Sequence, residues 1–182
     1  MKEGIRVIGI TSGPIGNKDA VVFGIIIRSG VIEGALSTRV AVNGCDGTKK
    51  ILRMIAGSRF KTQIKAIALN GIAIAGLNVV DVNELEKKLN VNVFIVTRKK
   101  PKVMKLVGAV KKFSTSNGLD RNSQIKIIKE FAKNTPRRFG SFYIQGRVAG
   151  GMENISAMLF DAVRASHIVA RALATGESKG RI

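Results

Sequence analysis

The chain has 182 residues, 45% of them hydrophobic and only three of them proline, which indicates a single folded domain with ample length for a core. Its 31 lysine and arginine residues outnumber the 12 aspartate and glutamate residues, and the net charge of +19 favours an anionic partner, most often nucleic acid. The single cysteine excludes an internal disulfide. With no apolar stretch of about 18–20 residues and no signal-peptide pattern, we expect a soluble cytoplasmic protein without a membrane partner.

The first three predicted elements are strands. Residues 5–11 form an apolar run that ends in a turn at 12–14. Two further runs, 20–28 and 31–42, are joined at 29–30 by Ser-Gly, a two-residue hairpin signal. Strands joined by so short a turn must be antiparallel, so we expect the chain to begin with three antiparallel strands.

Helices and strands alternate through the rest of the chain. Periodicity and capping residues predict a helix over 48–56, a strand over 64–69, a helix over 82–89, a strand over 92–97, helices over 102–113 and 121–133, a strand over 142–148 and a helix over 153–175 with a break near Val163. The polar tail at 176–182 is expected to be loosely ordered. This order predicts an α/β fold whose mixed sheet has three antiparallel strands followed by parallel ones, with helices on both faces.

The strand over 64–69 is expected at the centre of the sheet. It is a short apolar run that stops at Asn70-Gly71, and such runs, bounded by a turn signal, are typical of buried central strands. Ligands of open α/β sheets lie beyond the carboxyl ends of their strands. Asn70 therefore occupies a position at which chemistry is commonly placed.

Lysine and arginine gather in windows that contain no acidic residue. The first runs over 49–65, the second over 98–112, and a third cluster at 137–139 combines two arginines with a phenylalanine. Phosphate contacts by such residues bind nucleic acid without recognising sequence, and they weaken steeply with salt. A solvated basic face is the alternative. The residues expected to contact nucleic acid are Lys49, Lys50, Arg53, Arg98, Lys99, Lys100, Lys102, Lys105, Lys112, Arg137 and Arg138.

Six stretches, in the same order along nearly the whole chain, resemble one known family. They are I-R-V-I-G-I-T-S-G-P-I, G-A-L-S-T-R-V-A-V-N-G-C-D-G-T-K-K-I, I-A-L-N-G-I-A-I-A-G-L-N-V-V-D, V-F-I-V-T-R-K-K-P, F-Y-I-Q-G-R-V-A-G-G and V-R-A-S-H-I-V-A-R-A-L. With its G-x-N-V-V-D, R-K-K-P and R-x-x-H pieces in combination, the chain resembles the archaeal endonuclease dU family, which is regarded as related to endonuclease V. The resemblance implies a ribonuclease H-like, endonuclease V-like fold over residues 1–182.

The resemblance also implies metal-dependent cleavage of DNA beside a damaged base such as deoxyuridine. That chemistry needs carboxylates that converge from several strand ends to hold Mg²⁺ or Mn²⁺. Where the family has acids, this chain has Thr11 and Ser12, Asn43 and Asn70. Asp46 alone remains as a weak candidate for a metal ligand, and a helix cap is the alternative for it.

The last predicted helix holds the R-x-x-H piece of the resemblance, Arg164 and His167. The resemblance gives His167 a role facing the site and adds Arg164 to the expected nucleic-acid contacts; a packed or capping histidine is the alternative. Asp161 stands where the family often has glutamate. Cys45 is expected to be a small packed residue, and residues 149–151 are expected to form a plain turn rather than a phosphate site.

Neutral side chains at three of the family's acidic positions bring no charge to a hard dication. We therefore expect a protein that binds DNA or RNA through phosphates, without a cofactor, on an endonuclease-like scaffold with a degenerate metal site. One alternative is an active Mg²⁺- or Mn²⁺-dependent endonuclease for deaminated DNA that recruits Asp46, Asp161 or Glu153 as ligands. The second alternative is a protein-interaction subunit of a nucleoprotein complex.

Overall fold

The fold is that of a computed structural model, which describes residues 4–147 and 152–178. Its strands are β1 (Arg6–Ile15), β2 (Asp19–Arg28), β3 (Val31–Ala41), β4 (Ile64–Leu69), β5 (Ala73–Ile74), β6 (Asn78–Val79), β7 (Asn92–Thr97), β8 (Arg137–Phe139) and β9 (Phe142–Gln145). Its helices are α1 (Gly47–Ala56), α2 (Val82–Leu89), α3 (Val103–Asn117), α4 (Asn122–Phe131) and α5 (Met152–Thr175).

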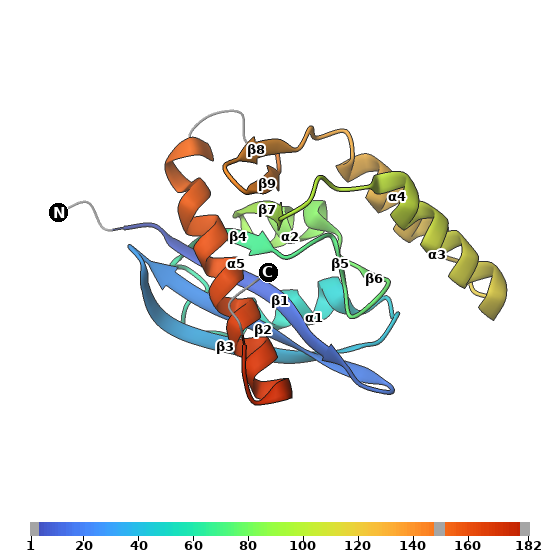
Figure 1. The fold of residues 1–182 in the computed structure, drawn as a ribbon, viewed down its shortest axis with the longest axis horizontal. Helices are drawn as coiled ribbons and strands as arrows, with labels where there is room; N and C mark the ends of the chain where they lie inside the picture. Colours follow the sequence, from blue (N-terminus) through green and yellow to red (C-terminus); the bar gives the residue numbers. More distant parts are fainter. Residues whose placement is uncertain (1–3, 148–151, 179–182) are drawn as a thin grey trace.

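Seven strands form one mixed sheet in the order β3-β2-β1-β4-β7-β9-β8. The β1–β2 and β2–β3 pairs are antiparallel, the β1–β4 and β4–β7 pairs are parallel, and β9 pairs antiparallel with both β7 and β8. In Figure 1, α5 lies across one face of this sheet, while α1 and α2 lie on the other. The predicted α/β fold, with antiparallel strands leading into parallel ones and helices on both faces, is confirmed; the last predicted strand, β9, differs in being antiparallel to its neighbour β7.

Several predicted boundaries were wrong. Strand β1 continues to Ile15 through the predicted turn, because a register shift beyond Ser12 keeps it paired with β2. Helix α3 runs to Asn117, four residues further than expected, and ends where Gly118 adopts a left-handed conformation with φ of 60°. Helix α5 is continuous, with no break near Val163.

Other differences concern short strands and the end of the chain. The basic cluster at 137–139 is itself a strand, β8, and the segment 72–80 holds the two-residue strands β5 and β6. Cys45 is exposed rather than packed. The tail beyond residue 178, the end of the last predicted strand at 148 and the predicted turn at 149–151 lie outside the described residues.

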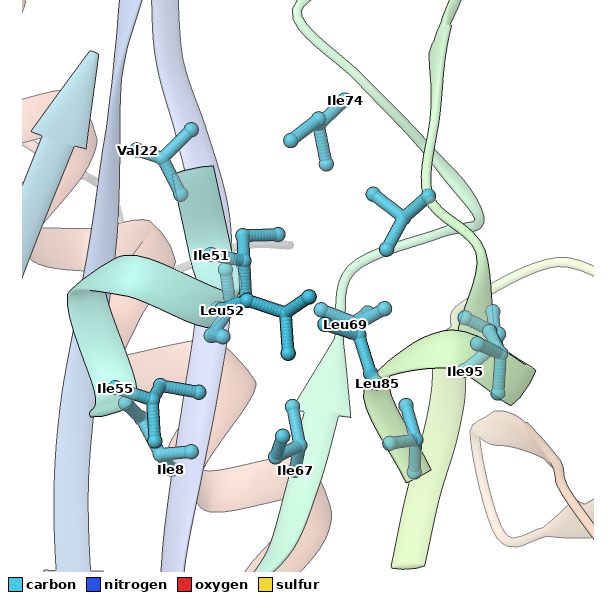
Figure 2. Close-up of a cluster of buried hydrophobic side chains, with 14 of the residues drawn as sticks. Ile8, Val22, Ile51, Leu52, Ile55, Ile67, Leu69, Ile74, Leu85 and Ile95 are labelled. Atoms are coloured by element: carbon cyan, nitrogen blue, oxygen red, sulfur yellow. The ribbon is translucent and has the colours of Figure 1, made fainter. Parts of the chain in front are cut away.

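Alternation along the strands divides the core between the two faces of the sheet. Ile8 and Ile10 of β1 join a cluster with α1 and α2, shown in Figure 2, whereas Val7 belongs to a second cluster beneath α5. The apolar stripe of α1 (Ile51, Leu52 and Ile55) is buried in the first cluster. Both faces of the central strands are thus apolar, as parallel strands require.

Helix α5 lies directly on β1 and has the same direction. A Cβ at Gly9 would lie 2.0 Å from the carbonyl carbon of Ala162, so only glycine permits this approach. Further along, Gly13 lies near the backbone of Ala170. The second half of α5 therefore ends up beside the carboxyl end of β1.

Candidate nucleic-acid interface at the carboxyl edge of the sheet

The carboxyl ends of β1, β4 and β7 meet at one edge of the sheet, here called the carboxyl edge. Ile10 pairs with Leu69, and Leu69 pairs with Ile95, so the residues that follow these strands are neighbours in space. Strand β3 ends at the same edge, because its last residue, Ala41, pairs with Asp19 at the start of β2. The topology therefore brings together the chain near residues 11, 43–50, 70 and 97–102.

Thr11 and Asn70 form a neutral pair at this edge. The Asn70 Nδ2 donates to Thr11 Oγ1 over 3.3 Å, and the backbone N–H of Asn70 donates to the carbonyl of Ile10 over 2.9 Å. Thr11 is almost fully buried and Asn70 is half-buried. Ser12 has a different partner: its Oγ accepts the N–H of Ala75 at 3.2 Å.

Asn43 stabilises a loop contact with the segment between β5 and β6. It has a left-handed conformation with φ of 52°, which asparagine tolerates better than most residues. Its Oδ1 accepts the N–H of Leu77 at 2.9 Å, and its own N–H donates to the carbonyl of Ala75 at 2.9 Å. The side-chain oxygen of Asn43 is therefore used in a hydrogen bond within the protein.

Asp46 precedes α1 but makes no side-chain capping bond to that helix. Both of its carboxylate oxygens accept the N–H of Ala41, at 3.1 and 3.3 Å, and Oδ1 also accepts from Asn78 Nδ2 at 2.7 Å. The capping role falls to Asn78, whose Oδ1 accepts the N–H of Gly47 at 2.9 Å. The Asp46 side chain therefore does not cap α1; it accepts hydrogen bonds from Ala41 and Asn78 instead.

A buried arginine adds positive charge behind the same loop. Arg121 is 5% exposed, and its guanidinium donates to the carbonyls of Asn43 and Gly44 and to Gln124 Oε1. It also lies over the ring of Phe113, 5.1 Å from the centroid. Each of these partners is neutral, so the loop that carries Asn43 and Asp46 is fixed by a cation without a carboxylate.

These residues do not fit a hard dication. The oxygens at positions 11, 43 and 46 already accept or share hydrogen bonds within the protein, and only Asp46 brings negative charge. Among the residues that the structure describes, no group of three or more histidine, cysteine, aspartate or glutamate side chains could hold a metal ion. Mg²⁺ and Mn²⁺ bind through several oxygen ligands, usually including carboxylates, and the neighbouring cations oppose them.

Helix α5 carries Arg164 and His167 four and seven residues after Phe160, which stacks on Phe142 of β9 with ring centroids 4.3 Å apart. Arg164 is exposed and His167 is half-buried. The level of His167 is set by its neighbour Ser166, whose Oγ donates to the carbonyl of Phe23, the residue paired with Thr11.

Asp161 and Glu153, the replacement metal ligands of the endonuclease alternative, belong to α5. Asp161 is exposed, and it lies one residue from the buried Ala162 that faces β1, on the solvent side of the helix. It does not converge with Thr11 and Asn70. The Glu153 side chain lies outside the described residues.

Cations surround the carboxyl edge. Lys49 and Lys50 lie in the first turn of α1, and the residues 98–100 and 102 connect β7 to α3. Arg138 lies level with Thr97, because both pair with Tyr143. Almost all of these side chains are exposed. The second half of the first basic window (49–65), around Lys65, instead lies at the start of β4, at the opposite edge of the sheet. Most of the basic residues selected from the sequence therefore lie near the carboxyl edge. The first basic window is divided between the carboxyl edge and the opposite edge of the sheet.

Three features were missed in the sequence. Asn78 lies within the G-x-N-V-V-D piece and Arg121 at the start of a predicted helix, and neither pattern predicts a functional contact for them. The side chains of Lys126, Lys129 and Lys133 lie along the outside of α4 and were not selected. Spacing of three and four residues was the available signal for these lysines. Nothing local predicts the partners of Asn78, or the bonds from Arg121 to Asn43 and Gly44, because these partners lie more than 30 residues away.

Comparison with known proteins gives one family and one fold. The family model described as Endonuclease dU matches residues 3–174. A UPF0215 protein of Methanosarcina mazei is 30% identical over 194 residues, which span 100% of this chain and 96% of that protein.

Within the described residues, no helix has the length and apolar character that crossing a bilayer requires.

Two solved structures have a similar fold. The crystal structure of a protein of unknown function from Archaeoglobus fulgidus has a TM-score of 0.79 and 28% identity, covering 94% of this chain and 99% of that chain. The crystal structure of human ENDOV has a TM-score of 0.54 and 13% identity, covering 92% and 83%. The second likeness shows the fold alone, and it agrees with the endonuclease V-like fold expected from the sequence.

Proposed function

This chain belongs to the endonuclease dU family, and from this premise we propose that it binds nucleic acid through the phosphate backbone while its metal site is degenerate. The family and the endonuclease V-like fold support a scaffold related to nucleases. Net charge and the position of the cations support a polyanionic partner. DNA and RNA share the phosphate chemistry that such a surface would recognise.

One observation carries the proposal most directly: the polar groups at the carboxyl edge hydrogen-bond to the protein and are almost all neutral. Thr11 pairs with Asn70, Asn43 with the backbone of Leu77, and Asp46 with Asn78. Cleavage of a phosphodiester by a dication needs carboxylates that place the metal beside the attacking and leaving oxygens. Phosphate binding needs only exposed cations, and these surround the same edge.

The first test is a cleavage assay. The purified protein is incubated with uracil- or inosine-containing duplex DNA in the presence of Mn²⁺ or Mg²⁺, and nicks are resolved on a denaturing gel. We expect no nicking above that of a protein-free control. Nicking that disappears in an Asp46→Ala variant would identify an active endonuclease and contradict the degenerate site.

The second test measures binding of a fluorescent random-sequence duplex between about 50 and 200 mM salt. We expect the affinity to fall steeply, with a slope in log–log form of about −0.9 for each phosphate contact. Replacing Lys99, Lys100 and Lys102 together by glutamine should reduce the magnitude of that slope by up to about 2.7, since three contacts are removed.

The matched control replaces Lys61, Lys65 and Lys87 together by glutamine. It removes the same charge, but from the opposite edge of the sheet and the end of α2. Its salt slope should stay close to that of the wild type. Equal effects of the two triple variants would show that net charge, and not a defined interface, governs binding. Duplex binding that is absent or insensitive to salt would contradict the proposed function itself.

A further inference from the structure

Three lysines follow one side of α4 and the turn after it. Lys126, Lys129 and Lys133 are spaced by three and four residues, about one helical turn apart. All three are exposed. Within the part of the chain that the structure describes, none of them takes part in a salt bridge or another side-chain interaction. We call these residues the α4 lysine stripe.

The α4 lysine stripe borders a shallow hollow of about 440 Å³. Asn122, Ile125 and Glu130 complete its lining. One carboxylate against three ammonium groups leaves the hollow with an excess of two positive charges. Like charges one turn apart on a helix repel each other, so the arrangement becomes favourable when an anion lies between them.

The stripe is separate from the carboxyl edge. Helices α3 and α4 pack against each other around their own apolar cluster and project from the sheet as a pair (Figure 1). The buried guanidinium of Arg121 fixes this pair to the loop at Asn43 and Gly44. A nucleic acid bound at the carboxyl edge would reach the stripe only through a segment that extends beyond that edge.

The spacing of the stripe matches a phosphate backbone. Lys133 lies two residues past the end of α4, in a turn in which its N–H donates to the carbonyl of Glu130 at 3.2 Å. At the helical rise of 1.5 Å per residue, Lys126 and Lys133 are about 10 Å apart along the axis. One strand of a duplex presents a charge about every 3.4 Å along the axis, so about three phosphates occupy that length.

We propose that the α4 lysine stripe is a second phosphate-binding surface, which holds the nucleic acid that flanks the segment bound at the carboxyl edge. The inference rests on the proposed function and adds a partner for a helix face to which the family motifs assign nothing. An acidic protein segment is the rival occupant. The stripe suits it less well, because Ile125 is the only apolar residue lining the hollow, and protein interfaces usually have an apolar centre.

The test replaces Lys126, Lys129 and Lys133 together by glutamine, which preserves helix propensity. Duplex affinity is measured across a salt series beside the wild type and the control in which Lys61, Lys65 and Lys87 are glutamine. The salt slope should decrease in magnitude by up to about 2.7 in the stripe variant, and by less than about 0.5 in the control. Far-ultraviolet circular dichroism and the melting temperature confirm that both variants are folded.

The outcomes separate the inference from the function on which it rests. A stripe variant whose slope equals that of the control would overturn the inference alone, because the wild type would still bind through the carboxyl edge. A wild type without salt-dependent binding would overturn both. Polyglutamate serves as an acidic polypeptide probe: if the stripe variant loses polyglutamate binding but keeps the wild-type duplex slope, the stripe is a protein-binding surface and the proposal is wrong.

Discussion

Replacing Asn78 by alanine should destabilise the protein strongly. The side chain is fully buried and makes three hydrogen bonds: with the N–H of Gly47, the carbonyl of Ala41 and the carboxylate of Asp46. Two bonds between neutral groups contribute about 1 kcal/mol each, and one to a charged group about 1.5–3 kcal/mol. The expected loss is therefore about 3.5–5 kcal/mol, a large share of the roughly 5–15 kcal/mol that stabilises a domain.

Urea unfolding followed by circular dichroism measures this loss, with Asn122→Ala as the matched control. Asn122 is exposed on α4, so its free energy of unfolding should change by less than about 0.5 kcal/mol. In a second variant, Asn78→Asp, two carboxylates face each other, and stability should rise as the pH falls and one of them takes up a proton. A loss below about 1 kcal/mol in Asn78→Ala, or an Asn78→Asp variant with wild-type pH dependence, would refute the reasoning.

Two further predictions concern charge. Partial burial raises the pKa of Glu33, but hydrogen bonds and charges from its two arginine partners outweigh that effect and hold the pKa below its ordinary value. The Glu33 carboxylate therefore stabilises the fold above about pH 4.3, and this contribution is lost as the pH falls through its lowered pKa. The difference in free energy of unfolding between the wild type and Glu33→Gln should accordingly shrink in acid titrations. Separately, replacing Thr11 and Asn70 together by aspartate should create Mn²⁺ affinity in calorimetry, because their polar atoms lie 3.3 Å apart, whereas Asn43→Asp alone should not; equal heats in the two variants would contradict this placement.

Local patterns predicted the parts of the fold that depend on them. Each of three features is predicted by its own residues alone and is present in the structure: the apolar run at 64–69, the hairpin signal at 29–30 and the apolar stripe of α1. Asp81 caps α2 by accepting the N–H of Glu84, another contact between near neighbours in sequence. The errors arose where distant contacts prevail. Strand β1 continues past its glycine and proline because β2 pairs with it, and β8 is a strand because β9 lies beside it.

The candidate site was only partly predictable for the same reason. The family motifs identified Thr11, Asn43, Asp46 and Asn70 as a set, and parallel strand ends placed two of them in contact. Sequence alone could not show that Asp46 is held by Asn78, 32 residues away. Hydrogen bonds of this kind depend on loop geometry that no period of two or 3.6 residues encodes.

The charge balance at the carboxyl edge connects these observations. A metal-dependent nuclease requires negative charge at the strand ends to offset both the dication and the phosphate that approaches it. Here those ends are neutral, and a buried arginine supports the adjacent loop. Under the proposed function, the exposed cations around the edge would attract a phosphate without any dication between them. Neutral side chains at the strand ends also lack the repulsion that bare carboxylates would exert on a phosphate, and this charge balance is the one on which the proposed function rests.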